Sequence, residues 1–145
     1  MKRLLAGLAL VSLLNSAAYA ANSCTAKTDL PISLYGATEV TPVECTIDTV
    51  DTDVTAFTPD STKMGALIGI SYAEGTAHNV KFTEGTDPQM MLEMGANGGI
   101  VKGIGEGMIF VSQIGNAIKF QSSAAITGPM ILYFIQAERF HPVTK

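Results

Sequence analysis

Two cysteines, Cys24 and Cys45, are the side chains whose chemistry this sequence predicts most directly, and they are the only cysteines in the chain. In an exported protein, an even number of cysteines indicates a disulfide bond. A redox pair prefers C-x-x-C spacing, and a structural zinc site needs four ligands. We therefore predict a disulfide whose loop of roughly 20 residues contributes about 3 kcal/mol in the chain-entropy description.

Catalytic chemistry has little support in the sequence. The chain contains two histidines, His78 and His141, and we expect both at the surface. A serine nucleophile on a G-x-S-x-G turn is absent, and both thiols are assigned to the disulfide. No pair of acids is flanked by the aromatic side chains that a sugar-cleaving site favours, and tryptophan is absent. We therefore do not predict an enzyme.

Metal-ligating side chains form two groups, neither of which has the spacing of a known metal motif. Oxygen ligands suit calcium, but the acidic group lacks the pattern of an EF-hand loop. Thioethers suit copper(I), but adaptable packing in a core explains clustered methionines as well. We predict no cofactor and no metal. The acidic group is Glu39, Glu44, Asp48, Asp51, Asp53 and Asp60, and the methionine group is Met90, Met91 and Met94.

The elements that would position these residues are strands. Turn signals recur every eight to fifteen residues, and between them apolar residues alternate with polar ones. Residues 89–94 fit either a strand or a helical turn. Near Asp48 and Thr49 the alternation of apolar and polar residues changes face, which indicates a bulge or bend. We expect a hairpin turn at 74–76 and another at 84–85. The other predicted strands are 30–34, 43–47, 50–54, 67–72, 80–82, 108–114, 117–120 and 130–137.

Two of these strands have predicted places in a sheet. Residues 130–137 are almost entirely apolar, which indicates burial on both faces and therefore a central strand. Leu30, Ile32 and Leu34 alternate with polar or turn-forming residues, and Pro31 places this run at an edge because proline cannot donate to the ladder. We expect Leu30, Ile32 and Leu34 to be the candidates for strand addition.

Seven to nine short strands at regular spacing predict one all-β domain. We favour an antiparallel, immunoglobulin-like β-sandwich, and a small β-barrel is the alternative. Repeats and linkers are absent. The chain of 145 residues is long enough for one such domain and its core.

The first twenty residues have the organisation of a secretory signal peptide. Lys2 and Arg3 precede an apolar run at 4–14, and Ala18-Tyr19-Ala20 forms a small-residue cleavage site. The apolar run is shorter than the roughly 20 residues that a membrane span requires. We therefore predict residues 1–20 as a signal peptide, residues 21–145 as the single mature domain, and no membrane span.

Composition excludes several classes of protein. The charged fraction of 15% is below the roughly 25% of ordinary soluble proteins, and the hydrophobic fraction is 47%, which excludes a disordered chain. The formal net charge is −4, whereas nucleic-acid binders cluster basic residues. We therefore expect no nucleic-acid partner.

The signal peptide, the single disulfide near the mature N-terminus and the all-β pattern together resemble the subunits of bacterial chaperone–usher fimbriae. Cys45-Thr46-Ile47-Asp48 is similar to their cysteine-bearing strand, residues 30–34 to an alternating donor segment, and 128–137 to their last strand. The resemblance implies an incomplete immunoglobulin-like sandwich that is completed by a strand from the next subunit. It also implies other fimbrial subunits and a periplasmic chaperone as partners.

Two functions of different class follow. The first is a structural or adhesive subunit of a bacterial surface fimbria, which predicts an unpaired edge and an oligomer. The second is a self-contained secreted or periplasmic binding module, such as an inhibitor, a toxin subunit or a ligand-binding protein. That alternative predicts a closed sandwich that folds alone.

Overall fold

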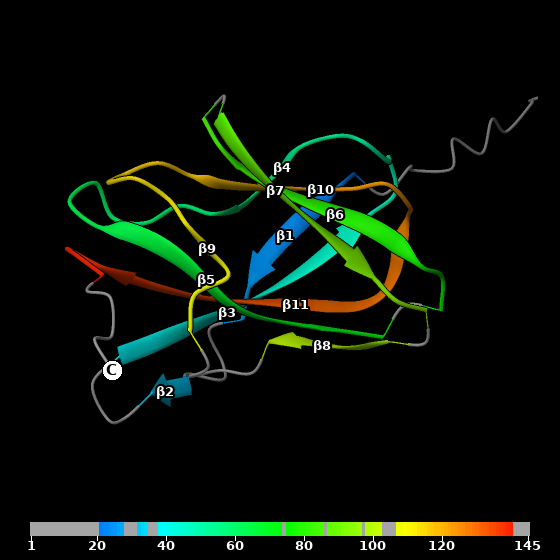
Figure 1. Ribbon diagram of the computed structural model, residues 1–145, viewed down its shortest axis with the longest axis horizontal. Coiled ribbons are helices and arrows are strands. Elements are labelled where there is room, and N and C mark those ends of the chain that lie inside the picture. The colour runs from blue at the N-terminus through cyan, green and yellow to red at the C-terminus, as the bar shows by residue number, and fades with distance from the viewer. Residues whose placement is uncertain are drawn as a thin grey trace, which may run out of the picture.

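A computed structural model describes residues 21–27, 32–34, 38–73, 75–85, 87–96, 98–102 and 107–140. The predicted signal peptide, Leu30, Pro31 and His141 lie outside these residues. The described chain is all-β and forms two antiparallel sheets that face each other without closing into a barrel (Figure 1). The predicted β-sandwich is therefore confirmed. No helix long and apolar enough to cross a membrane occurs in the described ranges.

The larger sheet contains seven strands within the described residues. Its main path runs β1-β3-β11-β5-β8, with β2 added beside β3 and β9 added beside β5. The bounds are β1 Ser23–Ala26, β2 Ile32–Leu34, β3 Thr38–Ile47, β5 Met64–Tyr72, β8 Gly99–Lys102, β9 Phe110–Val111 and β11 Ile126–Ala137.

In the part of the chain that the structure describes, the smaller sheet has four strands in the order β4-β10-β6-β7. Their bounds are β4 Val54–Phe57, β6 His78–Glu84, β7 Asp87–Met94 and β10 Ile118–Ser122. The ambiguous segment at 89–94 is thus a strand, and β6 and β7 pair as the hairpin predicted around 84–85.

The core lies between the two sheets and contains stacked and tilted aromatic rings. Phe57 from the smaller sheet stacks on Phe134 from the larger sheet, with ring centroids 4.8 Å apart. Phe82 contacts Phe120 at 5.4 Å within its own sheet and Phe110 at 6.4 Å across the core. These contacts join the two layers. The largest fully buried side chains include Phe82, Phe120, Phe134, Ile47, Leu67, Ile70, Met94, Ile118, Ile126, Met130 and Leu132.

Strand β11 lies between β3 and β5, so the predicted central position of 130–137 is confirmed. The strand begins earlier than expected, at Ile126, and passes through Gly128 and Pro129, where a register shift against β3 marks a bulge. One face of the strand is fully buried, with Met130, Leu132 and Phe134 in the core. The alternate residues are half-buried on the other face.

The sheet order corrects one local prediction and explains another. The turn at Gly75 and Thr76 is not a hairpin, because β5 and β6 belong to different sheets. The bend predicted near Asp48 and Thr49 is confirmed, and it is the point at which the chain leaves β3 and crosses to β4 in the other sheet. A local turn signal predicts that the chain reverses direction, but it does not predict which sheet the next strand joins.

Ile68 lies on a different face from the one its alternation predicts. Regular alternation along 67–72 predicts Ile68 on one face with Ile70 and Tyr72, but it joins a second apolar cluster with Val40 and Ala66. The cause is a register shift between β5 and β11, which pairs Tyr133 with Gly69 and its neighbour Phe134 with Leu67. An irregularity of this kind changes the face to which a side chain points. The half-buried members of the second cluster are Val111, Tyr133, Ile135 and Phe140.

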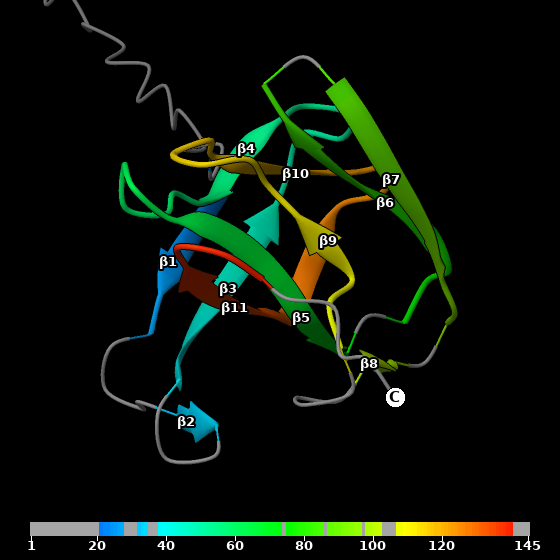
Figure 2. The ribbon, with the colours of Figure 1, turned by 60° about the vertical axis from the view of Figure 1, so that its left-hand side comes forward.

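The predicted disulfide between Cys24 and Cys45 is confirmed. The two cysteines are direct partners in the antiparallel pairing of β1 with β3. The bond therefore ties the first described strand to the edge of the larger sheet, and β1 in turn packs beside β4 of the smaller sheet (Figure 2). A disulfide fits an exported protein.

Candidate functional site

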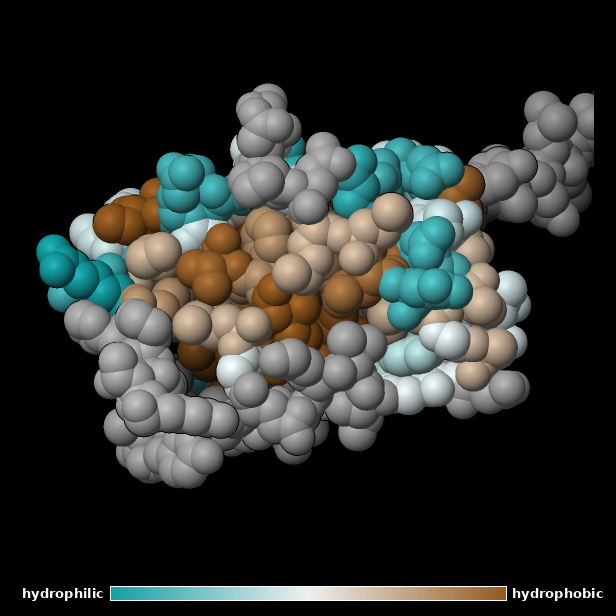
Figure 3. Space-filling model, viewed as in Figure 1, coloured by the Kyte–Doolittle hydropathy of each residue, from teal (hydrophilic) through white to brown (hydrophobic). Residues whose placement is uncertain are grey.

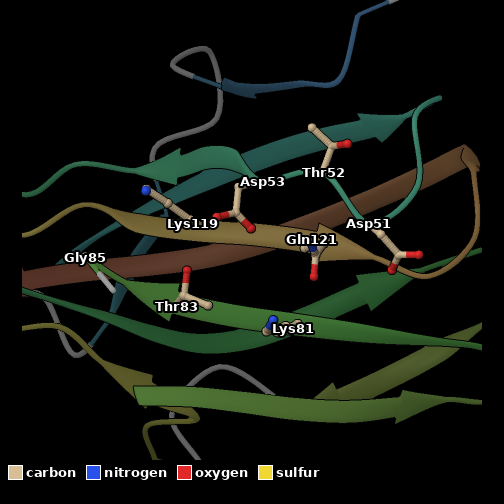
Figure 4. A pocket seen from close by; sticks show the side chains of 8 residues that line it. All are labelled: Asp51, Thr52, Asp53, Lys81, Thr83, Gly85, Lys119 and Gln121. Atoms are coloured by element: carbon tan, nitrogen blue, oxygen red, sulfur yellow. The ribbon is translucent and has the colours of Figure 1, made fainter. Parts of the chain in front are cut away.

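The outer face of the smaller sheet carries a polar hollow of about 580 Å³. This size lies within the range of small-molecule sites. Figure 4 shows the residues that line the hollow. It is lined by Asp51, Thr52 and Asp53 from the β3–β4 loop, Lys81 and Thr83 from β6, Gly85 from the β6–β7 turn, and Lys119 and Gln121 from β10.

Strand alternation explains why β6 and β10 supply polar groups to this face. The alternate positions of both strands are fully buried in the core: Val80, Phe82, Ile118 and Phe120. Because successive side chains of a strand point to opposite faces, Lys81, Thr83, Lys119 and Gln121 must point away from the core. The same apolar residues that hold the sheets together therefore fix the direction of the polar ones.

The register of β10 against β6 brings these four side chains together. Lys119 lies opposite Thr83, and Gln121 lies opposite Lys81. Cβ atoms of directly opposed residues are about 5 Å apart in antiparallel strands. The two lysines therefore occupy diagonal positions on adjacent strands, with a hydroxyl and an amide at the other two positions.

The β3–β4 loop completes the hollow and is held by contacts with two other segments. The Asp51 backbone N–H donates to the carbonyl of Ser122 at 2.8 Å, which fixes the loop against the end of β10. Asp51 has a φ of 52°, a left-handed conformation that Asp tolerates better than most residues. The Asn22 Oδ1 accepts from the backbone N–H groups of Asp48 and Thr49 at 2.9 Å and 2.8 Å. The segment before β1 thus supports the loop that carries Asp51 and Asp53.

Charges in the hollow balance without pairing. Lys81 and Lys119 oppose Asp51 and Asp53 in number, yet neither lysine has a carboxylate oxygen within 4 Å among the residues that the structure describes. The described ion pairs lie elsewhere, between Lys27 and Glu44 and between Lys63 and Asp60. The hollow therefore presents two ammonium groups and two carboxylates to solvent.

Thr83 has a property that a purely structural residue rarely has. The side chain is only 5% exposed, and its Oγ1 has no hydrogen-bond partner. Buried hydroxyls are nearly always paired, because leaving one unpaired costs about 1–3 kcal/mol. Among the described residues that line the hollow, Thr83 is therefore the one with a buried polar atom that has no hydrogen-bond partner in the protein.

The strand-addition residues lie at a different place. Ile32 and Leu34 are the two ends of β2, whose described pairing is with Thr38–Val40 of β3 alone. The segment therefore forms an edge within the described chain, and Leu30 lies outside the described residues. The hollow and this edge belong to different sheets.

Among the described residues, the side of the sandwich at β7 is less covered than the side at β4, and we call it the open side. On one side of the sandwich, β4 of the smaller sheet packs beside β1 of the larger sheet. On the other side, β7 does not pack to a comparable extent against β8 or β9 in the described ranges. Met90 and Leu92 of β7 are half-buried there against the core. Figure 3, in the same view as Figure 1, shows apolar surface in the middle of this face. Part of the methionine group therefore lines an incompletely covered core.

His78 corrects the expectation of two surface histidines. It is 5% exposed, its Nδ1 lies 2.8 Å from the Thr76 carbonyl oxygen, and its ring packs edge-on to Tyr72 at 6.2 Å. The Nε2 atom has no hydrogen-bond partner. The sequence contains the signal for this burial, since His78 has the same parity as Val80 and Phe82 in one strand.

Asp51 and Asp53 belong to the acidic group that stands out in the sequence. No sequence pattern marked Lys81, Lys119, Thr83 or Gln121 as residues of a site.

Within the described residues, no group of three or more histidine, cysteine or acidic side chains is arranged to hold a metal ion. Comparison with protein-family models, with curated proteins and with solved structures gives no match. The function must therefore be argued from this chain's own residues.

Proposed function

We propose that this protein is a structural or adhesive subunit of a bacterial surface fimbria and is assembled by strand addition. Its partners in this proposal are other fimbrial subunits and a periplasmic chaperone. The observation that carries the proposal is the open side of the sandwich in the described chain, where the eight-residue edge strand β7 contributes the half-buried side chains of Met90 and Leu92. The disulfide supports the exported location that such a subunit needs.

The edge of β7 has the features that strand addition uses. In the described chain β7 pairs only with β6, so its other side presents unpaired backbone groups. Register places Met90 opposite Phe82, and Leu92 opposite Val80, so both side chains lie on the core face. A strand added beside β7 would extend the sheet by backbone hydrogen bonds and cover these side chains with its own alternating apolar residues.

The segment 30–34 of a second subunit is the occupant that we assign to this edge. Leu30, Ile32 and Leu34 provide apolar residues at every second position, which matches the single apolar face that the added strand requires. Within its own chain, the described part of this segment is a three-residue strand at a sheet edge. A short edge strand has few hydrogen bonds to lose when it is exchanged.

Replacing both Ile32 and Leu34 by Asp tests this assignment. Two charges on the apolar face of the donor strand should weaken self-association by at least about tenfold, because charged residues at an edge block pairing. Sedimentation velocity over a range of protein concentrations measures the association. We expect the melting temperature of the monomer to change little by comparison.

The matched control is Ser33→Asp, which adds charge to the same segment at the alternate position. It should associate more strongly than the double variant. Equal weakening by both substitutions, or a wild-type protein that stays monomeric at all concentrations, would contradict the assignment.

The polar hollow favours a second candidate, a self-contained secreted or periplasmic binding module. In that case the sandwich needs no added strand, and the outer face of the smaller sheet carries the function. The two candidates differ in one observable: the first requires association through β7, whereas the second requires a stable monomer that binds a ligand in the hollow.

A further inference from the structure

The hollow on the outer face of the smaller sheet has the properties of a ligand site that strand addition at β7 does not use. Thr83 lies at its base, 95% buried, with a hydroxyl oxygen that no other group of the protein satisfies. Figure 4 shows this side chain among the residues that converge on the hollow, next to Gly85 and facing β10. A bound molecule that displaces the atoms covering this oxygen would supply the missing hydrogen bond.

The charges indicate which polar groups such a molecule carries. Lys81 and Lys119 stand on the strands that form the base, and their ammonium groups have no carboxylate within 4 Å in the described chain. Asp51 and Asp53 stand on the loop at the rim and are exposed. The ligand therefore needs an anionic group for the lysines and hydrogen-bond donors for the aspartates.

Several ligand classes do not fit this arrangement. An apolar molecule would find no hydrophobic side chain larger than the methyl groups of threonine in the lining. A polyanion would be repelled by Asp51 and Asp53 and by the formal net charge of −4. A bare metal ion would meet two lysines and only two acids. A small molecule that combines one carboxylate with several hydroxyls satisfies every group.

We propose that this hollow binds an acidic sugar, with its carboxylate on Lys81 and Lys119. One sugar oxygen satisfies the Thr83 hydroxyl, and sugar hydroxyls donate to the carboxylates of Asp51 and Asp53. The Gln121 amide can donate and accept beside them. This inference goes beyond assembly, because the hollow and the β7 edge use different residues and either can fail without the other.

Titration of the purified exported protein with glucuronic acid and N-acetylneuraminic acid, followed by NMR chemical-shift changes, tests the proposal. We expect saturable binding with shifts centred on β6, β10 and the β3–β4 loop. At least one acid should bind about tenfold more tightly than glucose, since a charge-assisted hydrogen bond is worth about that factor. Glycine, which carries both charges but no hydroxyls, should bind as weakly as glucose.

Three variants assign the binding to particular groups. Lys81→Gln together with Lys119→Gln should weaken binding of the acid at least about tenfold and leave glucose unaffected. Lys63→Gln, which removes a lysine outside the hollow, should change nothing. Thr83→Val should weaken binding while raising or preserving the melting temperature, because it removes an unpaired buried hydroxyl and keeps the shape of the side chain.

Specific outcomes would overturn the proposal. These are the absence of saturable binding by either acid up to about 10 mM, equal binding of glucose, equal binding of glycine, or full affinity in the double lysine variant. Retained affinity in the folded Thr83→Val variant would remove Thr83 from the site and contradict the assignment of its hydroxyl.

Discussion

Replacing Phe82 by alanine is expected to lower the free energy of unfolding by about 4 kcal/mol, the largest effect of any single substitution considered for this protein. Phe82 is fully buried and touches Phe120 within the smaller sheet and Phe110 from the larger one. Its removal leaves a cavity between the two sheets. The loss therefore combines the transfer of a large side chain to water with the cost of an unfilled space.

Chemical denaturation, followed by far-ultraviolet circular dichroism, measures this effect. Thr55→Ala, an exposed position in β4, is the control, and its free energy of unfolding should lie within about 0.5 kcal/mol of the wild type. A loss below about 1.5 kcal/mol for Phe82→Ala would mean that this ring does not join the sheets as the structure indicates.

Removal of the disulfide, by replacing Cys24 and Cys45 with alanine, is expected to destabilise the protein by about 3 kcal/mol. The bond closes a separation of 21 residues in the chain and holds β1 on the edge of β3. It also holds Asn22 near the loop that this side chain supports through Asp48 and Thr49. We therefore expect the β3–β4 loop to lose order along with β1.

The comparison of oxidised wild type, reduced wild type and the double alanine variant separates the bond from the side chains. The reduced protein and the variant should unfold at similar denaturant concentrations, well below the oxidised protein. Equal stability of the oxidised and reduced proteins would contradict a structural role for the bond.

The fold class could be predicted because it depends on local patterns. Alternation and turn spacing predict a β-sandwich, and the unbroken apolar run at 130–137 predicts the strand that lies at the centre of the larger sheet. The pairing of Cys24 with Cys45 followed from their number. Each of these inferences needs only the neighbours of a residue or the count of a residue type.

Features that depend on which strands become neighbours could not be predicted. The turn at Gly75 and Thr76 has the residues of a hairpin, yet the strands around it enter different sheets. Lys81 and Lys119 lie far apart in the sequence, and only the register of β6 against β10 places them on one surface. The polar hollow is therefore a property of the tertiary structure, although alternation already indicated that each lysine points away from the core.

His78 shows a case in which the local signal existed but was overridden by a general expectation. Histidines in loops are usually exposed, and His78 follows the turn signal at 74–76 closely in the sequence. Its parity with Val80 and Phe82 would have placed it on the buried face. Parity within a strand is therefore a better guide to burial than residue type at such a position.

Amide hydrogen exchange along β7 is the measurement that tests the assembly proposal most directly. Unpaired edge amides exchange quickly, and pairing with an added strand protects them. With increasing protein concentration, or with added peptide of sequence 29–35, we predict slower exchange at alternate amides of Asp87–Met94. Unchanged exchange in β7, in a protein that sediments as a monomer at every concentration, would contradict assembly by strand addition at this edge.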